Sequence, residues 1–371
     1  MSDLQKQVQV LVDGLVDDGV EDGVQVAVYR NGDLVVNVVA GVADTAAGQP
    51  VRPDTLFYSA STGKAAASTV AHALVDDGVF DYDTRVADLW PEFAAHGKGE
   101  VRIRHVLTHS AGVPAVPADT TIEQLTDWNG MCQLIAGMEP WWAPGERVGY
   151  HAATFGYLIG EVVRRATGKP ISTVLAERVA GPIGMADELF FGVPQEQLGR
   201  VARLTDDPGG KAAFASMPPD FPLFKAVPPA IVPNADFGNR TDVLTSDMPF
   251  AGTMSARAIA KMYAALTGEV DGVRLISPER LREATTLATA GLDDEMTGGT
   301  STWALGYCLG WPGTSDPSDR PTVFGMVGIG GSAAFADRAT GVTVAVTKNR
   351  FNPIEMNIVQ RVTELADEAF V

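Results

Sequence analysis

The residues of this chain with the clearest chemical potential are a serine and a lysine three positions apart. Ser61 and Lys64 stand at the start of a helical run at residues 65–77, so both side chains share one helix face. A serine hydroxyl is a weak nucleophile at neutral pH and needs an adjacent base. A desolvated lysine beside the positive end of a helix loses affinity for its proton and can act as that base. Free N–H groups at the helix start can bind a developing oxyanion.

The Ser-x-x-Lys spacing occurs once in the 371 residues, and such a pair alone is a weak signal. Taken by itself, it is explained better by a serine that caps a helix and a solvated lysine. Two further stretches carry candidate groups. Tyr150 lies in residues 142–158, which lead into a helix, and the glycine-rich residues 323–332 enter a strand. Between serine and tyrosine, residues 106–114 read Val-Leu-Thr-His-Ser-Ala-Gly-Val-Pro.

Together these motifs resemble the class C β-lactamase-like family, which includes β-lactamase-fold carboxylesterases, D-aminopeptidases and penicillin-binding proteins. The resemblance runs from about residue 23 to about residue 350, and the three motifs follow the family's order and spacing. The Leu-Thr-His-Ser-Ala-Gly and Pro-Gly-x-x-x-x-Tyr stretches are most similar to the esterase branch.

The resemblance implies a role for each matching residue. Ser61 would be the acylated nucleophile, Lys64 its partner, and Tyr150 a general base or proton shuttle. A phenol needs nearby cations to lower its pKa from about 10, and Lys64 would be that cation. The backbone N–H groups of Ser61 and Ile329 would form the oxyanion hole. Without the resemblance, a core aromatic would be the better interpretation of Tyr150.

The sequence departs from the family pattern at two places in the expected substrate-binding region. Ala152 stands where β-lactamases carry an asparagine that holds the substrate amide. Met326-Val327-Gly328 stands where they carry Lys-Thr-Gly, and where many esterases carry His-x-Gly. A methionine cannot bind a carboxylate, so the sequence favours neutral or differently anchored esters over β-lactams and D-peptides. His151, next to Tyr150, either lines the pocket or has a structural role.

The periodicity predicts sheet elements at both ends of the chain and helices between them. Residues 24–30 and 34–39 flank Asn31-Gly32, a strong hairpin signal, and residues 332–337 and 342–348 form a second strand pair. Helical patterns cover residues 4–16, 65–77, 122–138, 154–167, 171–179 and 353–370. Eight prolines between residues 206 and 249 indicate no regular element there. Such a segment is a lid or pocket wall, or a plain surface loop.

The fold class predicted from these patterns and from the resemblance is α/β and similar to β-lactamases and penicillin-binding proteins. An antiparallel sheet flanked by helices would be joined to an inserted, mainly helical lobe. We predict an α/β lobe from residues 1–85 and 245–371. Residues 86–244 would form the helical lobe with a proline-rich pocket wall.

Composition narrows the function classes. A net charge of −18 disfavours nucleic acid and anionic membranes as partners. The two cysteines imply no disulfide framework, and no ligand spacing predicts a metal or cofactor; His105 and His109, four apart, lack a third ligand. The N-terminus shows neither a leader nor a membrane span, so we expect a cytoplasmic protein.

Several other residues receive a structural interpretation. The acidic pairs at residues 17–18, 76–77, 206–207 and 293–294 are expected to be solvated caps. Large aromatic side chains either wall an acyl pocket or pack in the core: Trp128, Trp141, Trp142, Trp303 and Phe224. No Gly-x-Ser-x-Gly elbow is present, which argues against an α/β-hydrolase.

Three functions remain open on the sequence. The first is hydrolysis of a small carboxylic ester through an acyl-enzyme on Ser61, with acyl transfer to another acceptor as a close variant. The second is a β-lactamase or D-amino-acid peptidase or amidase. The third is a non-catalytic binding relative, which the intact serine, lysine and tyrosine disfavour. The sequence does not indicate an oligomeric state.

Overall fold

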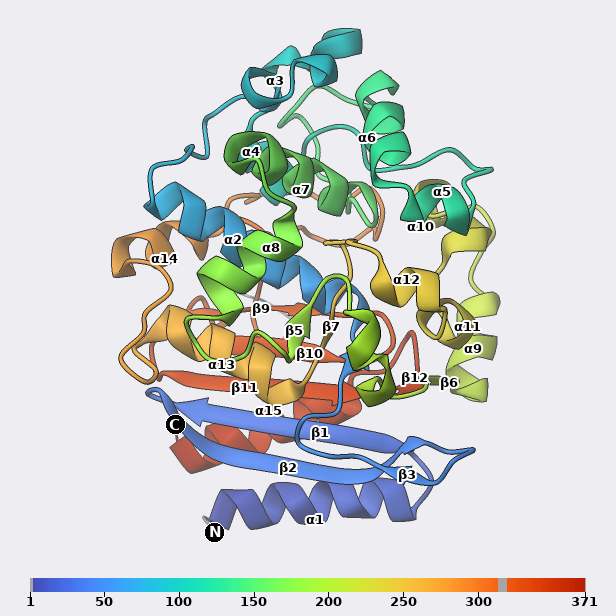
Figure 1. The fold of residues 1–371 in the computed structure, drawn as a ribbon, viewed down its shortest axis with the longest axis vertical. Coiled ribbons are helices and arrows are strands. Elements are labelled where there is room, and N and C mark those ends of the chain that lie inside the picture. Colours follow the sequence, from blue (N-terminus) through green and yellow to red (C-terminus); the bar gives the residue numbers. More distant parts are fainter. Residues whose placement is uncertain (1–2, 313–318, 371) are drawn as a thin grey trace.

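The computed structural model describes residues 3–312 and 319–370, and its centre is a seven-stranded antiparallel sheet of order β3-β2-β1-β11-β10-β9-β8. Strands from the two ends of the chain meet in its middle, because β1 pairs with β11 and places Val26 opposite Val346 (Figure 1). The strands are β1 (Gly23–Arg30), β2 (Asp33–Asp44), β3 (Gln49–Pro50), β8 (Cys308–Leu309), β9 (Val323–Val327), β10 (Ala333–Asp337) and β11 (Val342–Lys348). Both predicted strand pairs are confirmed, and Asn31 and Gly32 adopt the positive φ angles of the predicted turn.

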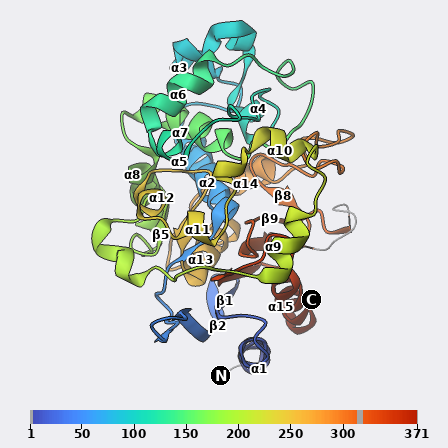
Figure 2. The ribbon, with the colours of Figure 1, turned by 90° about the vertical axis from the view of Figure 1, so that its right-hand side faces the viewer.

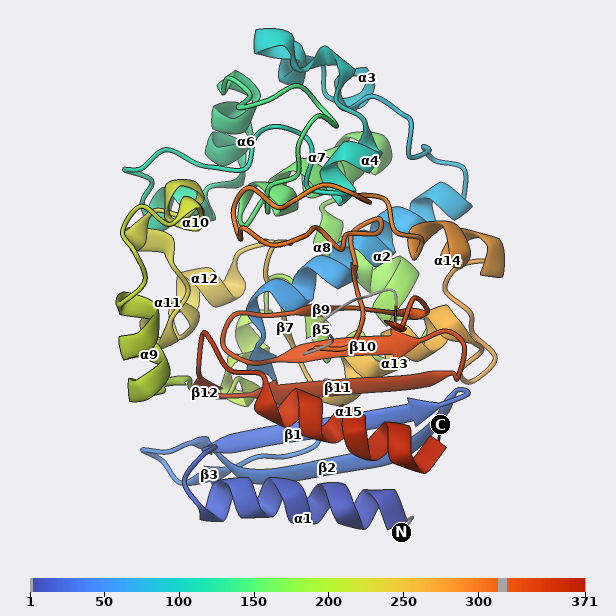
Figure 3. The same cartoon turned by 180° about the vertical axis from the view of Figure 1, so that it is seen from behind.

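Helices cover both faces of the sheet. Helices α1 (Asp3–Asp17) and α15 (Asn357–Phe370) pack side by side on one face, and α13 (Ala256–Thr267) packs on the other (Figure 3). Alternate strand residues face opposite layers. Val26 therefore joins the first core, between the sheet and α1 and α15, and Ala27 joins the second core, on the side of α13. The second core continues into the helical region and carries the candidate site.

The helical region lies beyond α2 (Gly63–Asp76), as a side view of the ribbon shows (Figure 2). The predicted helix at residues 154–167 forms as α7 (Thr154–Thr167). The predicted helix at 122–138 is divided into α5 (Ile122–Thr126) and α6 (Trp128–Gly137), because the Asp127 carboxylate accepts the Gly130 N–H and starts a new helix. The run at 171–179 forms α8 (Ile171–Leu175) followed by a π-helical turn at Ala176–Ala180.

The proline-rich segment corrects one prediction, since it contains short helices rather than no regular structure. These are α9 (Pro208–Ala215), α10 (Pro222–Ala226), η5 (Pro229–Ile231), α11 (Ala235–Gly238) and α12 (Thr241–Thr245). Pro208 and Pro222 stand at helix starts, where a proline loses no hydrogen bond and already has a helical φ. Several of the prolines therefore begin helices here instead of preventing them.

The remaining elements are short. They are β4 (Phe57–Tyr58), β5 (Leu189–Phe190) and β7 (Thr253–Met254) in one small sheet, β6 (Thr205–Asp206) with β12 (Arg350–Phe351), and η1 (Ala60–Thr62), α3 (Val86–Leu89), η2 (Pro91–Glu100), α4 (Ile103–Leu107), η4 (Gln195–Arg200) and α14 (Pro278–Ala284). The lobe boundaries at residues 85/86 and 244/245 stay predictions. Within residues 3–312 and 319–370, every helix is too short or too polar to cross a membrane.

Candidate active site

Ser61 lies in the 3-10 turn η1, between β4 and α2. The residue before it, Ala60, has φ +44, a left-handed conformation that costs energy for a residue other than glycine and that often marks functional sites. Gly63 lets the turn press against the chain at residues 251–252, since a Cβ atom there would lie 2.3 Å from the Ala251 carbonyl carbon. Ser61 is the second residue of η1, so its N–H has no carbonyl acceptor within that turn.

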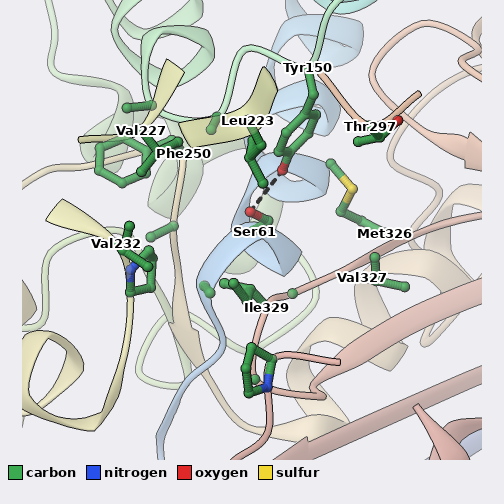
Figure 4. Close-up of a pocket in the computed structure, with 18 of the residues that line it drawn as sticks. Ser61, Tyr150, Leu223, Val227, Val232, Phe250, Thr297, Met326, Val327 and Ile329 are labelled. Carbon is green, nitrogen blue, oxygen red and sulfur yellow. Dashed lines mark hydrogen bonds between the residues drawn. The ribbon is translucent and has the colours of Figure 1, made fainter. Parts of the chain in front are cut away.

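The three side chains that the sequence predicted to act together meet at one point. The Lys64 Nζ atom lies 3.1 Å from Ser61 Oγ and donates a 2.9 Å hydrogen bond to the Phe250 carbonyl. The Tyr150 hydroxyl donates to Ser61 Oγ at 2.8 Å (Figure 4). The serine oxygen is therefore bracketed by an amine and a phenol, which is the geometry that nucleophile activation requires.

Lys64 is fully buried, and burial lowers the pKa of its amine well below the ordinary lysine value. Its two hydrogen-bond partners are a hydroxyl and a carbonyl, so no negative charge offsets the cost of desolvation. An amine that has lost its proton has a free lone pair. The Ser61 hydroxyl can donate its proton to that lone pair.

The pKa of Tyr150 corrects a second prediction. Burial raises the pKa of the phenol, and Cys308 and Asp294 add to this rise, while the hydrogen bond to Ser61 opposes it. Lys64 does not lower the phenol pKa as expected, because burial favours the neutral amine. Tyr150 therefore keeps its proton at neutral pH and is placed to donate it.

These opposite shifts predict the pH dependence of the reaction. Because Lys64 must be neutral to accept the serine proton, we expect kcat/KM for a neutral ester to rise with pH through one ionisation well below the ordinary lysine pKa, and to stay level above it. The high pKa of Tyr150 produces no loss in that range. A pH series of kcat/KM measures this limb, and a rate that climbs only near the ordinary lysine pKa would contradict it. His109 is the control, because it is also buried with a lowered pKa. If Lys64 is the group that titrates, the rise in kcat/KM with pH should persist in His109→Asn.

An apolar cavity of about 550 Å³ opens over Ser61 and Tyr150. Figure 4 shows Val227, Val232 and Phe250 on one side of the serine, Met326 and Val327 on the other, and Leu223 above it. Much of the first wall comes from the proline-rich segment. Among the lining residues in the described part of the chain, Asp294 carries the one charged side chain. Its Oδ1 atom already accepts hydrogen bonds from the backbone N–H groups of Tyr150 and Met296.

Four of the predicted substrate-binding residues line this cavity, and one does not. Ala152, Met326, Val327 and Gly328 lie in its wall. His151 is fully buried and does not line the cavity, which corrects that option. Its Nε2 atom accepts the Val113 N–H, and its Nδ1 atom lies 2.6 Å from the Gly149 carbonyl. Both ring nitrogens are thus bound to the backbone, and the role of His151 is structural.

The end of β9 packs directly against the serine turn. A Cβ atom at Gly328 would lie 2.2 Å from the Ser59 carbonyl oxygen and 2.9 Å from Thr62 Oγ1, so only glycine permits this approach. Ile329 follows in the wall of the cavity beside Ser61. An oxyanion role for the N–H groups of Ile329 and Ser61 stays a prediction.

Asp294 corrects the interpretation of the acidic pair at residues 293–294. Asp294 is only 4% exposed, and its Oδ1 atom accepts the N–H groups of Tyr150, Met296 and Thr297. Asp293 is exposed, as expected. Nothing in the spacing of two adjacent acids distinguishes the buried one from the solvated one.

Two other sets of residues are placed differently from the sequence interpretation. Helix α4 ends at Leu107, and His109 follows with φ +57, so His105 and His109 share no helix face. Of the five large aromatic residues, Trp303 and Phe224 line the cavity. The other three do not line it: Trp128, Trp141 and Trp142.

Known proteins resemble this chain along nearly its whole length. A family model described as beta-lactamase matches residues 8–366. The esterase/beta-lactamase LipL of Mycobacterium tuberculosis is 33% identical over 344 residues, which is 89% of this chain and 78% of LipL. A solved family VIII carboxylesterase is similar with a TM-score of 0.89 and 32% identity, over 100% of this chain and 98% of that one. A penicillin-binding protein homologue from Caulobacter crescentus gives a TM-score of 0.82 and 32% identity with the same coverage.

Proposed function

The chain belongs to the beta-lactamase family, and from this premise we propose that it is a carboxylesterase that cleaves neutral esters through an acyl-enzyme on Ser61. The observation that carries the proposal is the position of Ser61 Oγ between the amine of Lys64 and the phenol of Tyr150, at an apolar cavity. Relatives named as an esterase/beta-lactamase and a family VIII carboxylesterase support a serine ester hydrolase.

Acylation begins with the neutral amine of Lys64. As Ser61 Oγ attacks the ester carbonyl carbon, its proton passes to Lys64 Nζ and the carbonyl electron pair moves to oxygen. The N–H groups of Ser61 and Ile329 would stabilise this oxyanion. The Phe250 carbonyl, which accepts from Lys64 Nζ, stabilises the ammonium that forms.

The leaving alcohol needs a proton when the tetrahedral intermediate collapses. The Tyr150 hydroxyl, 2.8 Å from Ser61 Oγ, donates it, and the phenolate regains a proton from Lys64. Water then loses a proton to the restored base, attacks the acyl carbon and releases the acid and the free serine. Acyl transfer follows the same steps with an alcohol or amine in place of water.

The cavity wall favours uncharged substrates. No lysine, arginine or histidine is among its lining residues in the described part of the chain, and Met326 is buried where a cation would hold a substrate carboxylate. A carboxylate in this cavity would be desolvated without a partner, which is costly. The same argument disfavours β-lactams and D-peptides as substrates.

A direct comparison of substrates tests the proposal. We expect p-nitrophenyl butyrate to be cleaved with a kcat/KM at least about 100-fold above that for nitrocefin, since the anionic β-lactam lacks a cation in the site. Initial rates on both compounds measure this ratio. A matched pair is an ester that also carries a free carboxylate and the same compound with that carboxylate methylated, since the two differ in the negative charge. Rapid nitrocefin cleavage without ester cleavage would overturn the proposal in favour of a β-lactamase. A fluorophosphonate probe that leaves Ser61 unlabelled would favour a non-catalytic relative.

The partner and compartment predictions follow from the acidic composition and the sequence. A small ester or acyl compound as substrate, no nucleic-acid or membrane partner, and a cytoplasmic location stay predictions. No cofactor enters the proposed steps.

A further inference from the structure

Three consecutive backbone N–H groups around Tyr150 donate to only two residues from other parts of the chain. The Gly149 N–H donates to the His109 carbonyl at 3.0 Å, and the His151 N–H donates to His109 Nδ1 at 3.1 Å. Between them, the Tyr150 N–H donates to Asp294 Oδ1 at 3.2 Å. The backbone on both sides of the tyrosine and at the tyrosine itself is thus fixed.

The same two segments also hold the tyrosine ring. The His109 ring centroid lies 4.8 Å from that of Tyr150, and Trp303 stacks on Tyr150 at 5.7 Å with an angle of 8° between the rings. Trp303 lies on the same segment as Asp294, between α14 and β8, and its own N–H donates to Thr289 Oγ1 at 3.1 Å. Neither the backbone nor the ring of Tyr150 can shift without breaking these contacts.

His109 and Asp294 are themselves fixed by the chain around them. His109 has φ +57, which turns its carbonyl and its ring toward residues 149–151. Its Nδ1 atom accepts a hydrogen bond, so the neutral ring carries its proton on Nε2. Asp294 Oδ1 is held by the N–H groups of Met296 and Thr297. A left-handed backbone and a buried carboxylate are both costly.

We propose that His109 and Asp294 are positioning residues that hold the Tyr150 hydroxyl on the leaving-group oxygen. This inference rests on the proton-donor role proposed above for Tyr150. Neither residue donates a hydrogen bond to Ser61 or Lys64, so both act through Tyr150. If they are lost, the phenol moves by a fraction of an ångström to an ångström, and a shift of that size costs roughly 10- to 100-fold in rate.

The test uses two esters of one acid whose alcohols differ in their need for a proton. p-Nitrophenolate leaves without one, whereas ethoxide needs one, so a misplaced proton donor slows ethyl butyrate more than p-nitrophenyl butyrate. We expect His109→Ala and Asp294→Ala to lower kcat/KM for the ethyl ester about 10-fold more than for the p-nitrophenyl ester. A merely structural role would lower both equally, since it would change only the amount of folded enzyme.

Matched variants sharpen the result. His109→Asn should restore the ratio, because an asparagine oxygen can accept the His151 N–H and asparagine tolerates the left-handed backbone. Asp293→Ala, an exposed acid on the same loop, should leave both rates unchanged. Where an alanine variant does not fold, Asp294→Asn and His109→Gln weaken or displace the same acceptors, and the ratio of the two esters decides in the same way.

Tyr150→Phe separates this inference from the proposed function. If Tyr150→Phe slows both esters equally, the proton-donor role of Tyr150 is wrong and the proposed mechanism fails. If Tyr150→Phe is selective for the ethyl ester but the His109 and Asp294 variants slow both esters equally, the positioning role is overturned and the mechanism stands. Selectivity in all three variants, with recovery in His109→Asn, supports it.

Discussion

Replacement of Ser61 by alanine is expected to remove ester turnover almost completely, with a fall in kcat of roughly 10⁴- to 10⁶-fold, as for other catalytic serines. Only Ser61 Oγ lies within hydrogen-bonding distance of both Lys64 and Tyr150 among the described residues. Mass spectrometry of the intact protein after incubation with a panel of esters should show an added acyl mass on the wild type. That mass should be absent from Ser61→Ala.

Ser68 supplies the matched control for this experiment. It lies on α2, the helix that follows the turn of Ser61, and its hydroxyl donates to the Lys64 carbonyl at 2.9 Å, away from the cavity lining. Ser68→Ala should still acquire the acyl mass and react with a fluorophosphonate probe. An acyl adduct that persists in Ser61→Ala would place the nucleophile elsewhere and refute the acyl-enzyme assigned to Ser61.

The reacting groups could be predicted because three motifs together resemble a known family. The serine and amine three apart are a weak signal alone, as is the tyrosine, but the order and spacing of the motifs single them out, and the structure brings all three together. The contacts that hold Tyr150 could not be predicted. Asp294 accepts a hydrogen bond from a backbone N–H that lies 144 residues away in the chain. Because every residue except proline has such an N–H group, the residue type does not reveal which group is bonded. The prediction that the pKa of Tyr150 is lowered was wrong for a related reason, since the burial that raises this pKa depends on the tertiary structure.

The fold was predicted where local pattern and tertiary packing agree. Strands β1 and β2 alternate around an Asn-Gly turn, and the confirmed β-lactamase-like fold follows from them and from the motifs. Prediction failed where one residue type has two uses. Prolines at helix starts looked like breaks, and Asp127 inside a helical pattern proved to be a cap. For Asp127 the deciding interaction is one hydrogen bond, from the Gly130 N–H, and for the prolines it is the place of the residue at the helix start; periodicity registers neither.

Replacement of Lys64 distinguishes two roles for its amine, that of a neutral base and that of a structural cation. Lys64→Met should lower kcat/KM for p-nitrophenyl butyrate by about 10²- to 10⁴-fold, the usual contribution of a general base. Lys64→Arg should be as inactive, because a guanidinium keeps its proton at all accessible pH values. A steady-state assay with active-site titration measures both variants. Substantial activity in Lys64→Arg would show that a positive charge suffices, and would contradict the neutral amine.

Stability should change in the opposite direction to activity at this position. The Lys64 amine is buried with one carbonyl and one hydroxyl as partners, so replacement by a methionine of similar size removes a desolvation cost, and we expect Lys64→Met to melt at a higher temperature. Lys98 is the contrasting buried lysine, because its Nζ donates to the carbonyls of Ala95, Ala136 and Met138. Lys98→Met should cost about 1–3 kcal/mol of unfolding free energy while the folded enzyme keeps its kcat. Lys64→Met would then raise the melting temperature and lower kcat, whereas Lys98→Met would lower the melting temperature and leave kcat unchanged, as expected if Lys64 is buried for chemistry and Lys98 for structure.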